Sequence, residues 1–109
     1  MDNPYLFLPN LVEQITEIQP DSIISRTIYQ DANIKAILFG FSTGQELSEH
    51  TASTPAIIHI LDGEASVILG KDEFQVSSVA WMHLTPHLSH SIYAKTPVRM
   101  LLLLIRRYD

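Results

Sequence analysis

Short apolar runs separated by turn-forming residues make up most of this chain. Runs of isoleucine, valine, leucine and phenylalanine alternate with glycine, proline, asparagine and aspartate at short intervals. This spacing is typical of many short antiparallel strands that pack as a sandwich or a barrel. It predicts an all-β fold with strands over residues 22–29, 34–41, 46–50, 56–61, 64–69, 73–76, 79–84, 90–94 and 98–105.

Residues 56–61 and 100–105 are apolar at nearly every position. A strand in a sheet with one wet face would alternate apolar and polar residues, whereas a continuous apolar run indicates burial on both faces. We therefore expect the second face to be covered by the N-terminal segment or by a second copy of the chain.

Two segments that contain glycine are predicted to be tight hairpins. Residues 61–64 form the first, because Gly63 can adopt the positive φ that such a turn requires. Residues 70–72 form the second.

A helical pattern occurs near the N-terminus. Leu11, Ile15 and Ile18 recur at helical spacing, and Asn10 can cap the first turn. We expect a single domain with a short helical segment in an N-terminal arm of about residues 1–22, followed by a barrel of about residues 23–105.

Composition narrows the classes of function. The chain has 109 residues, a net charge of −5 and no cysteine. Disulfides and cysteine-ligated metals are therefore excluded, and the lack of clustered lysine and arginine argues against nucleic acid. Neither a signal peptide nor the ~20 apolar residues needed to span a bilayer are present, so we expect a cytoplasmic protein with no membrane partner. The charged fraction of 17% is low and favours a homodimer.

The segment from residue 44 to residue 63 contains part of a known motif. Gly44, His50 and Gly63 lie where the first signature motif of the cupin superfamily has glycine, histidine and glycine. Ala52 and Ala56 occupy the positions of its second histidine and its glutamate. The chain therefore resembles the cupins, and in particular small single-domain cupins of the RmlC-like type.

The second cupin motif is matched at His90, with Pro86 one place from the expected proline. The resemblance implies a small antiparallel double-stranded β-helix, which is the jelly-roll barrel. It also implies a metal site at His50 and His90. Metal-binding cupins hold iron, manganese, nickel, copper or zinc with three histidines and one glutamate. Two imidazoles without a carboxylate suit zinc or copper better than iron or manganese, and the other expectation is that no metal binds.

Two further residues are candidates to complete the metal shell. Glu46 shares a strand face with His50 if side chains alternate strictly. His59 interrupts an apolar strand, and the same alternation turns it away from the inward face of Ala56 unless a bulge intervenes. The alternative for His59 is a hydrogen-bonded histidine in a subunit interface.

Other residues are candidates for the barrel pocket. His87 occupies a motif glycine position at the barrel mouth, where it would contact or gate a ligand or remain a solvated loop residue. His83 alternates with Trp81 and is either a ligand or an ordinary strand histidine. The pocket candidates are His83, His87, Ala52, Ala56, Ile58 and Trp81.

Three functions are compatible with these residues. The first is a binding module that holds a small organic ligand beside a weak or degenerate divalent-metal site. The second is a metal-dependent oxygenase or isomerase of a small organic molecule, which requires a further metal ligand. The third is a structural or interaction protein with a vestigial site. The binding module is favoured, because Ala52 and Ala56 remove two ligands and leave an apolar cavity.

Overall fold

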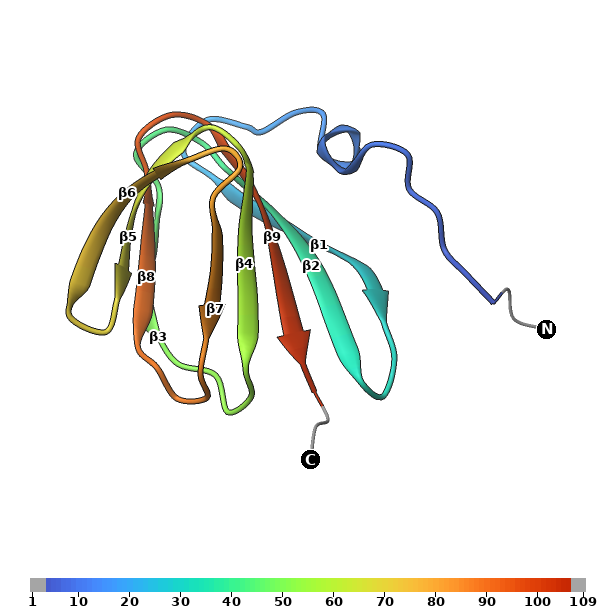
Figure 1. The fold of residues 1–109 in the computed structure, drawn as a ribbon. Coiled ribbons are helices and arrows are strands. Elements are labelled where there is room, and N and C mark those ends of the chain that lie inside the picture. The colour runs from blue at the N-terminus through green and yellow to red at the C-terminus, as the bar shows by residue number, and fades with distance from the viewer. Residues whose placement is uncertain (1–3, 107–109) are drawn as a thin grey trace.

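The computed structural model describes residues 4–106, with the backbone alone described at residues 49 and 50. Two antiparallel sheets face each other as the walls of a barrel (Figure 1), which confirms the predicted all-β jelly roll. The elements are the 3₁₀ helix η1 (Leu11–Gln14) and the strands β1 (Ile23–Gln30), β2 (Ile34–Phe41), β3 (Glu46–His50), β4 (Ala56–Asp62), β5 (Glu64–Leu69), β6 (Asp72–Ser77), β7 (Trp81–Leu84), β8 (His90–Ala94) and β9 (Val98–Ile105).

The sheets bring together strands that are far apart in the sequence. The larger sheet has the order β1-β2-β9-β4-β7, and the smaller has the order β3-β8-β5-β6. The C-terminal strand β9 therefore lies in the middle of the larger sheet, between β2 and β4. This central position explains why β9 is apolar at nearly every residue, since both of its faces are covered in part.

The turn at residues 61–64 carries the chain from one sheet to the other. Strand β4 pairs with β7 and β9, whereas β5 pairs with β6 and β8, so the predicted hairpin is wrong. Gly63 has the expected positive φ, at +93°. A side chain at this position would collide with the carbonyl oxygen of Pro97. Glycine is needed here for both its conformation and the close approach of another turn.

The second predicted hairpin is confirmed. Leu69 and Asp72 are paired across it, and Gly70 has a φ of +65°. The strand predicted over residues 79–84 begins later, at Trp81. The backbone N–H of Ala80 instead closes a turn on the carbonyl oxygen of Ser77, at 2.8 Å.

Apolar side chains from both sheets fill the barrel. Ile58 and Ile60 of β4 are fully buried, and they share this core with Val67 of β5 and Ile92 of β8. Because the core is built across the two sheets, burial of these side chains holds the walls of the barrel together. The remaining buried members are Phe41, Ala56, Ala65, Leu84, Ala94, Val98, Met100 and Leu102.

The N-terminal arm covers part of the outer face of the larger sheet, which was one of the two expectations for its apolar strands. Figure 1 shows the arm, in blue, outside the barrel on the side of β1 and β2. Ile15 is 4% exposed, and with Ile18 it lies against Gly40 of β2. The predicted helical segment is present but is shorter than the spacing from Leu11 to Ile18 indicated, because η1 ends at Gln14 and Ile15 is already extended. The Asn10 side chain accepts a hydrogen bond from the N–H of Val12 at 3.1 Å. No helix among residues 4–106 is long and apolar enough to cross a membrane.

Candidate functional site

Backbone pairing brings His50 and His90 to the same end of the smaller sheet. Residue 50 of β3 lies opposite His90 of β8, and His90 lies opposite Leu69 of β5. The side chain of His50 lies outside the described part of the structure. His90 is 4% exposed, and its Nδ1 lies 3.1 Å from the carbonyl oxygen of Leu88. Since a carbonyl oxygen only accepts, Nδ1 carries the proton in this bond.

The loop before β8 is bonded to the segment that follows β3. The backbone N–H of His87 donates to the carbonyl oxygen of Ala52 at 2.7 Å. His87 has a φ of +69°, in the left-handed region that glycine occupies more readily than other residues. Its side chain is exposed, and Ala52 is half-buried. The structure therefore brings His87, Ala52 and His90 to the end of the barrel where β3 closes on residue 50.

Glu46 lies on the opposite face of the smaller sheet from His90. Strict alternation would place it on the face of His50, but the pairing of β3 with β8 shifts register after Leu47. Glu46 lies opposite Tyr93, and both side chains are exposed. Glu46 was chosen as a candidate ligand because strict alternation would place it on the face of His50. The register shift breaks that alternation, and the sequence pattern gives no sign of such a shift.

His59 and His83 lie on the outer face of the larger sheet. Alternation holds along this part of β4, since Ile58 is fully buried and His59 is half-buried on the other side. His59 lies opposite Trp81 of β7, and the exposed His83 lies on the same face of that strand. Both histidines therefore face away from His90, as alternation predicted for His59.

A cavity of about 340 Å³ lies at the seam between the edge strands β6 and β7. Trp81, a predicted pocket residue, lines this cavity and is 60% exposed. The pocket candidates Ala56 and Ile58 are instead packed in the core, at 2% and 0% exposure. The other residues that line the cavity are Leu69, Phe74, Gln75, Val76, Ala80 and Met82.

Apart from Trp81, the sequence analysis predicted none of these lining residues to be pocket residues. It placed them only in strands. They come from three strands and a turn, and only the sheet order makes β6 and β7 neighbours across the seam. The sole local signal is the alternation of Phe74 and Val76 with polar residues, which is typical of a partly covered edge strand. Leu69 connects the cavity to the histidine end of the barrel, because it is the ladder partner of His90.

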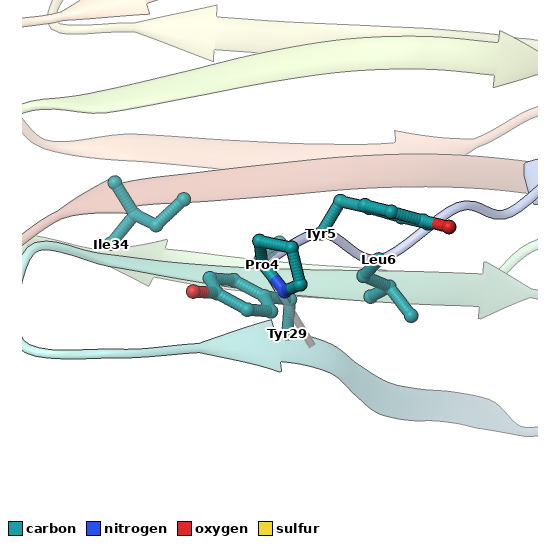
Figure 2. Close-up of a pocket in the computed structure, with 6 residues that line it drawn as sticks. Pro4, Tyr5, Leu6, Tyr29 and Ile34 are labelled. Carbon is teal, nitrogen blue, oxygen red and sulfur yellow. The ribbon is translucent and has the colours of Figure 1, made fainter. Parts of the chain in front are cut away.

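A second cavity, of about 320 Å³, lies between the N-terminal arm and the outer face of the larger sheet. Figure 2 shows the arm residues Pro4, Tyr5 and Leu6 over the strands that carry Tyr29 and Ile34. Ala36 completes the lining, which is mostly apolar.

One carboxylate is held beside this second cavity. The Tyr29 hydroxyl donates to Asp31 Oδ2 at 2.7 Å, and this bond raises the pKa of Tyr29. The same bond lowers the pKa of Asp31, with help from the backbone N–H groups of Ile34 and Asn33. These groups are exposed, and their bonds order the β1–β2 turn.

The donors around His90 fit a late divalent metal only in part. Among the side chains that the structure describes, no three histidine, cysteine, aspartate or glutamate residues are grouped so that they could hold an ion. Ala52 and Ala56 present methyl groups where the cupin motif has ligands. Imidazole nitrogen is thus the donor type at this end of the barrel, and it suits zinc, copper or nickel better than a hard, oxygen-preferring ion.

Comparisons with known proteins bear on the fold. No family model and no curated protein sequence matches the chain. A solved cupin superfamily protein from Desulfitobacterium hafniense is 21% identical and has a TM-score of 0.84, with 97% of each chain covered. An RmlC-like cupin protein from Desulfovibrio desulfuricans is 21% identical with a TM-score of 0.82, over 94% of this chain and 98% of that chain.

A conserved protein of unknown function from Streptococcus pyogenes is similar to the same degree. It is 22% identical with a TM-score of 0.82, over 100% of this chain and 93% of its own. Identities at this level carry information on architecture, and the similarity extends over nearly the whole chain in each case. With its two antiparallel sheets and these neighbours, the chain has the fold of a small cupin.

Proposed function

We propose that this protein binds a small organic molecule in the cavity between β6 and β7. The main support for this proposal is the cavity itself, because its volume of about 340 Å³ falls within the ~300–1,000 Å³ typical of ligand sites. Its lining is apolar apart from Gln75. The amide nitrogen of Gln75 donates to Ser66 Oγ at 3.1 Å and to Glu73 Oε2 at 3.3 Å, so its amide oxygen is the atom that can accept a hydrogen bond from a ligand. A ligand with a flat apolar body and one polar substituent matches this arrangement, since Phe74 and Trp81 can stack on it.

The proposal includes a weak site for a late divalent metal at His50 and His90. The bond from Nδ1 of His90 to the carbonyl oxygen of Leu88 supports it, because such a bond orients a metal-binding imidazole with Nε2 as the ligand atom. The link through Leu69 would place this metal beside the cavity. Elemental analysis of untagged protein is the test, and loss of bound metal in His50→Ala is the expected result. Protein that stays metal-free at saturating zinc or copper would contradict this part.

The intrinsic fluorescence of Trp81 tests the cavity directly. Trp81 is the sole tryptophan of the chain and lines the cavity, so tryptophan emission reports on the surroundings of this one residue when tyrosine is not excited. Screening a library of small aromatic and apolar acids, amides and alcohols should produce saturable changes in emission. A matched pair of variants tests whether these emission changes come from binding in the cavity. Ala80→Phe fills the cavity and should abolish the response. Val79→Phe adds the same ring at an exposed neighbour outside the lining and should keep it.

If Ala80→Phe and Val79→Phe respond alike, the binding molecule lies elsewhere, and the cavity loses its proposed role. A natural choice for that other place is the groove under the N-terminal arm. Its lining by Tyr29 and Tyr5 makes it accessible to a parallel measurement of tyrosine emission.

We also propose that two copies of the chain associate through the outer face of the larger sheet. Ile57, Leu101 and Leu103 are only half-buried there, beside the exposed Trp81. On this face, the aligned positions of β4, β7 and β9 between the Asp62–Arg99 ion pair and Arg106 have no formal charge, which suits a chain with a net charge of −5 that must meet its own copy. Sedimentation should find a dimer at micromolar concentration and a monomer for Leu101→Glu. A monomeric wild-type protein would refute the association.

A further inference from the structure

An apolar band crosses the outer face of the larger sheet and begins under the N-terminal arm. Tyr29 of β1 lies opposite Ala36 of β2, which lies opposite Leu103 of β9, and Leu103 in turn lies opposite Ile57 of β4. Residues directly opposite each other on neighbouring strands share a face of the sheet. Tyr29 and Ala36 line the groove under the arm, a cavity of about 320 Å³, whereas Leu103 and Ile57 belong to the proposed dimer face. The groove and the dimer face are therefore parts of one surface.

The arm presents large apolar side chains to water beside this band. Tyr5 is 75% exposed, Leu6 is 53% exposed and Phe7 is 73% exposed. Tyr5 and Leu6 line the groove under the arm, and Phe7 is the one of the three that does not. An aromatic side chain that is three-quarters exposed leaves roughly 110–190 Å² in contact with water. Because contiguous apolar surface of this kind marks interaction sites, Phe7 is available to contact another molecule.

The root of the arm is fixed on the sheet, so Phe7 stays close to the band. Ile15 is 4% exposed, and the guanidinium of Arg99 donates to the carbonyl oxygens of Ile15 and Thr16. The eight residues from Ile15 back to Phe7 span at most roughly 26–29 Å when fully extended. The side chain of Phe7 is thus held near the dimer face before two copies meet. This restriction lowers the entropy that association must remove.

The surface is suited to a second copy of this chain. In a two-fold interface each copy offers the same patch, so the patch must contain both a projecting part and a part that receives it. Phe7 and the groove meet this condition. Residues 4–12 carry no charge and therefore do not repel a copy of a chain whose net charge is −5. A lipid surface favours lysine or arginine beside the apolar residues, and this segment has neither.

The arm also supplies area that the sheet alone lacks. A standard interface buries about 800 Å² on each partner. Ile57, Leu101 and Leu103 are already half-buried within their own chain. Tyr5 and Phe7 together would add roughly 220–380 Å² on each copy, which is at least about a quarter of that area.

We propose that Phe7 of each copy enters the groove of the other copy and packs there on Tyr29, Ile34 and Ala36. The role of Phe7 rests on the proposed association through the outer face, and it makes the arm a clasp between the two copies. The groove is mostly apolar, so water in it has few hydrogen-bond partners and leaves readily when an aromatic ring enters. Phe7 is then a buried aromatic anchor at the interface, the kind of residue on which association depends most.

The dissociation constant of the dimer, measured by sedimentation over a dilution series, tests the role of Phe7. Phe7→Ser removes the ring and should weaken association by at least about tenfold, whereas Phe7→Leu keeps an apolar side chain and should weaken it less. Because Phe7 is 73% exposed in the single chain, neither change should alter the urea midpoint at concentrations where the wild type is monomeric. Tyr93→Ser is the matched control. It removes an exposed aromatic ring from the outer face of the smaller sheet and should leave the dissociation constant unchanged.

Isotope-filtered NMR shows whether the Phe7 ring packs on its own chain or on the other copy. Dimers are formed from a mixture of isotope-labelled and unlabelled chains, so that contacts between copies are recorded separately from contacts within one chain. Cross-peaks are expected between the Phe7 ring of one copy and the methyl groups of Ile34 and Ala36 of the other.

The outcomes separate the role of Phe7 from the dimer itself. If the wild type is a dimer and Phe7→Ser associates as tightly, or if the Phe7 cross-peaks arise only within one chain, the role of Phe7 is overturned and the outer-face dimer stands. A monomeric wild type overturns both, and binding of that monomer to phosphatidylserine vesicles would assign the arm to a lipid surface instead. Weaker association of Phe7→Ser together with cross-peaks between copies supports the inference.

Discussion

Arg99 of β9 and Asp62 of β4 form an ion pair, with Arg99 Nη1 at 2.9 Å from Asp62 Oδ2. The same guanidinium reaches the N-terminal arm, where its Nε donates to the carbonyl oxygen of Ile15 at 2.7 Å and its Nη2 to that of Thr16 at 3.2 Å. One planar group therefore fastens the arm to the larger sheet. The donors of Arg99 form a fixed fork, and this suits it to several oxygens at once.

Replacing Arg99 should loosen the arm more than it unfolds the barrel. Arg99→Met keeps the aliphatic stem and leaves two backbone carbonyls without their charged donor, at a cost of about 1–3 kcal/mol. Urea unfolding measures this loss, and limited proteolysis should cut the arm faster than in the wild type. Asp62→Asn is the matched control. Asp62 is half exposed, so loss of its charge should cost at most about 1 kcal/mol. Equal losses for the two variants would show that the ion pair, and not the arm contacts, is the important bond.

Two glycines with similar φ values separate backbone strain from steric collision. Gly63 has a φ of +93° and its added methyl would strike the carbonyl oxygen of Pro97, whereas Gly44 has a φ of +86° and open space around it. Gly44→Ala should destabilise the protein by roughly 1–2 kcal/mol from conformation alone. Gly63→Ala should cost about 1–3 kcal/mol more, because the turn between the two sheets must move. Denaturant midpoints of the two variants give the comparison, and similar midpoints would mean that the turn yields freely.

The buried face of β4 should be far more sensitive to truncation than the exposed face of β5. Ile58 is fully buried in the barrel, and Ile68 is 40% exposed. Ile58→Ala should lose about 2–5 kcal/mol through lost burial and the cavity that remains. Ile68→Ala should lose less than about 1 kcal/mol, because 40% of its surface is already in contact with water and it lies outside the barrel core. Thermal and urea unfolding of both variants provide the check. A small loss at Ile58 would imply that neighbouring side chains collapse into the space.

The carboxylate of Asp31 should add to stability only above acid pH. Its pKa is lowered by the Tyr29 hydroxyl first, and then by the backbone N–H groups of Ile34 and Asn33. A group with a lowered folded-state pKa contributes stability above its unfolded pKa, and the contribution disappears as the pH falls through the folded-state pKa. In Tyr29→Phe, the pKa of Asp31 should move back toward its ordinary value.

Carbon-detected NMR titration of the Asp31 carboxyl group measures that change. Tyr93→Phe removes an exposed tyrosine hydroxyl elsewhere in the protein and should leave the pKa of Asp31 where it was. An unchanged pKa in Tyr29→Phe would mean that the backbone donors alone hold the carboxylate.

Local pattern determined the strands of this protein with little help from tertiary contacts. The bounds of β2, β3, β5, β8 and β9 agree with the predicted ranges. Turn residues border two of them directly, Gly63 and Gly70 at β5 and Pro97 at β9, and alternation separates the faces. The outward orientation of His59 followed from the same period of two. The cap by Asn10 and the positive φ of Gly63 and Gly70 were also local, since each depends on the chemistry of one residue.

The tertiary structure decided which strands meet and where a cavity forms. The turn at Gly63 has the local chemistry of a hairpin, yet it joins two different sheets because β4 pairs with β9 and β7. The shift in register after Leu47 turns Glu46 away from the histidine end, and no periodic pattern contains such an irregularity. The contact of His87 with Ala52 and the cavity beside Trp81 likewise join segments far apart in the sequence. Sequence periodicity shows which side chains of a strand share a face. Which strands pair and which residues line a cavity depend on packing throughout the barrel.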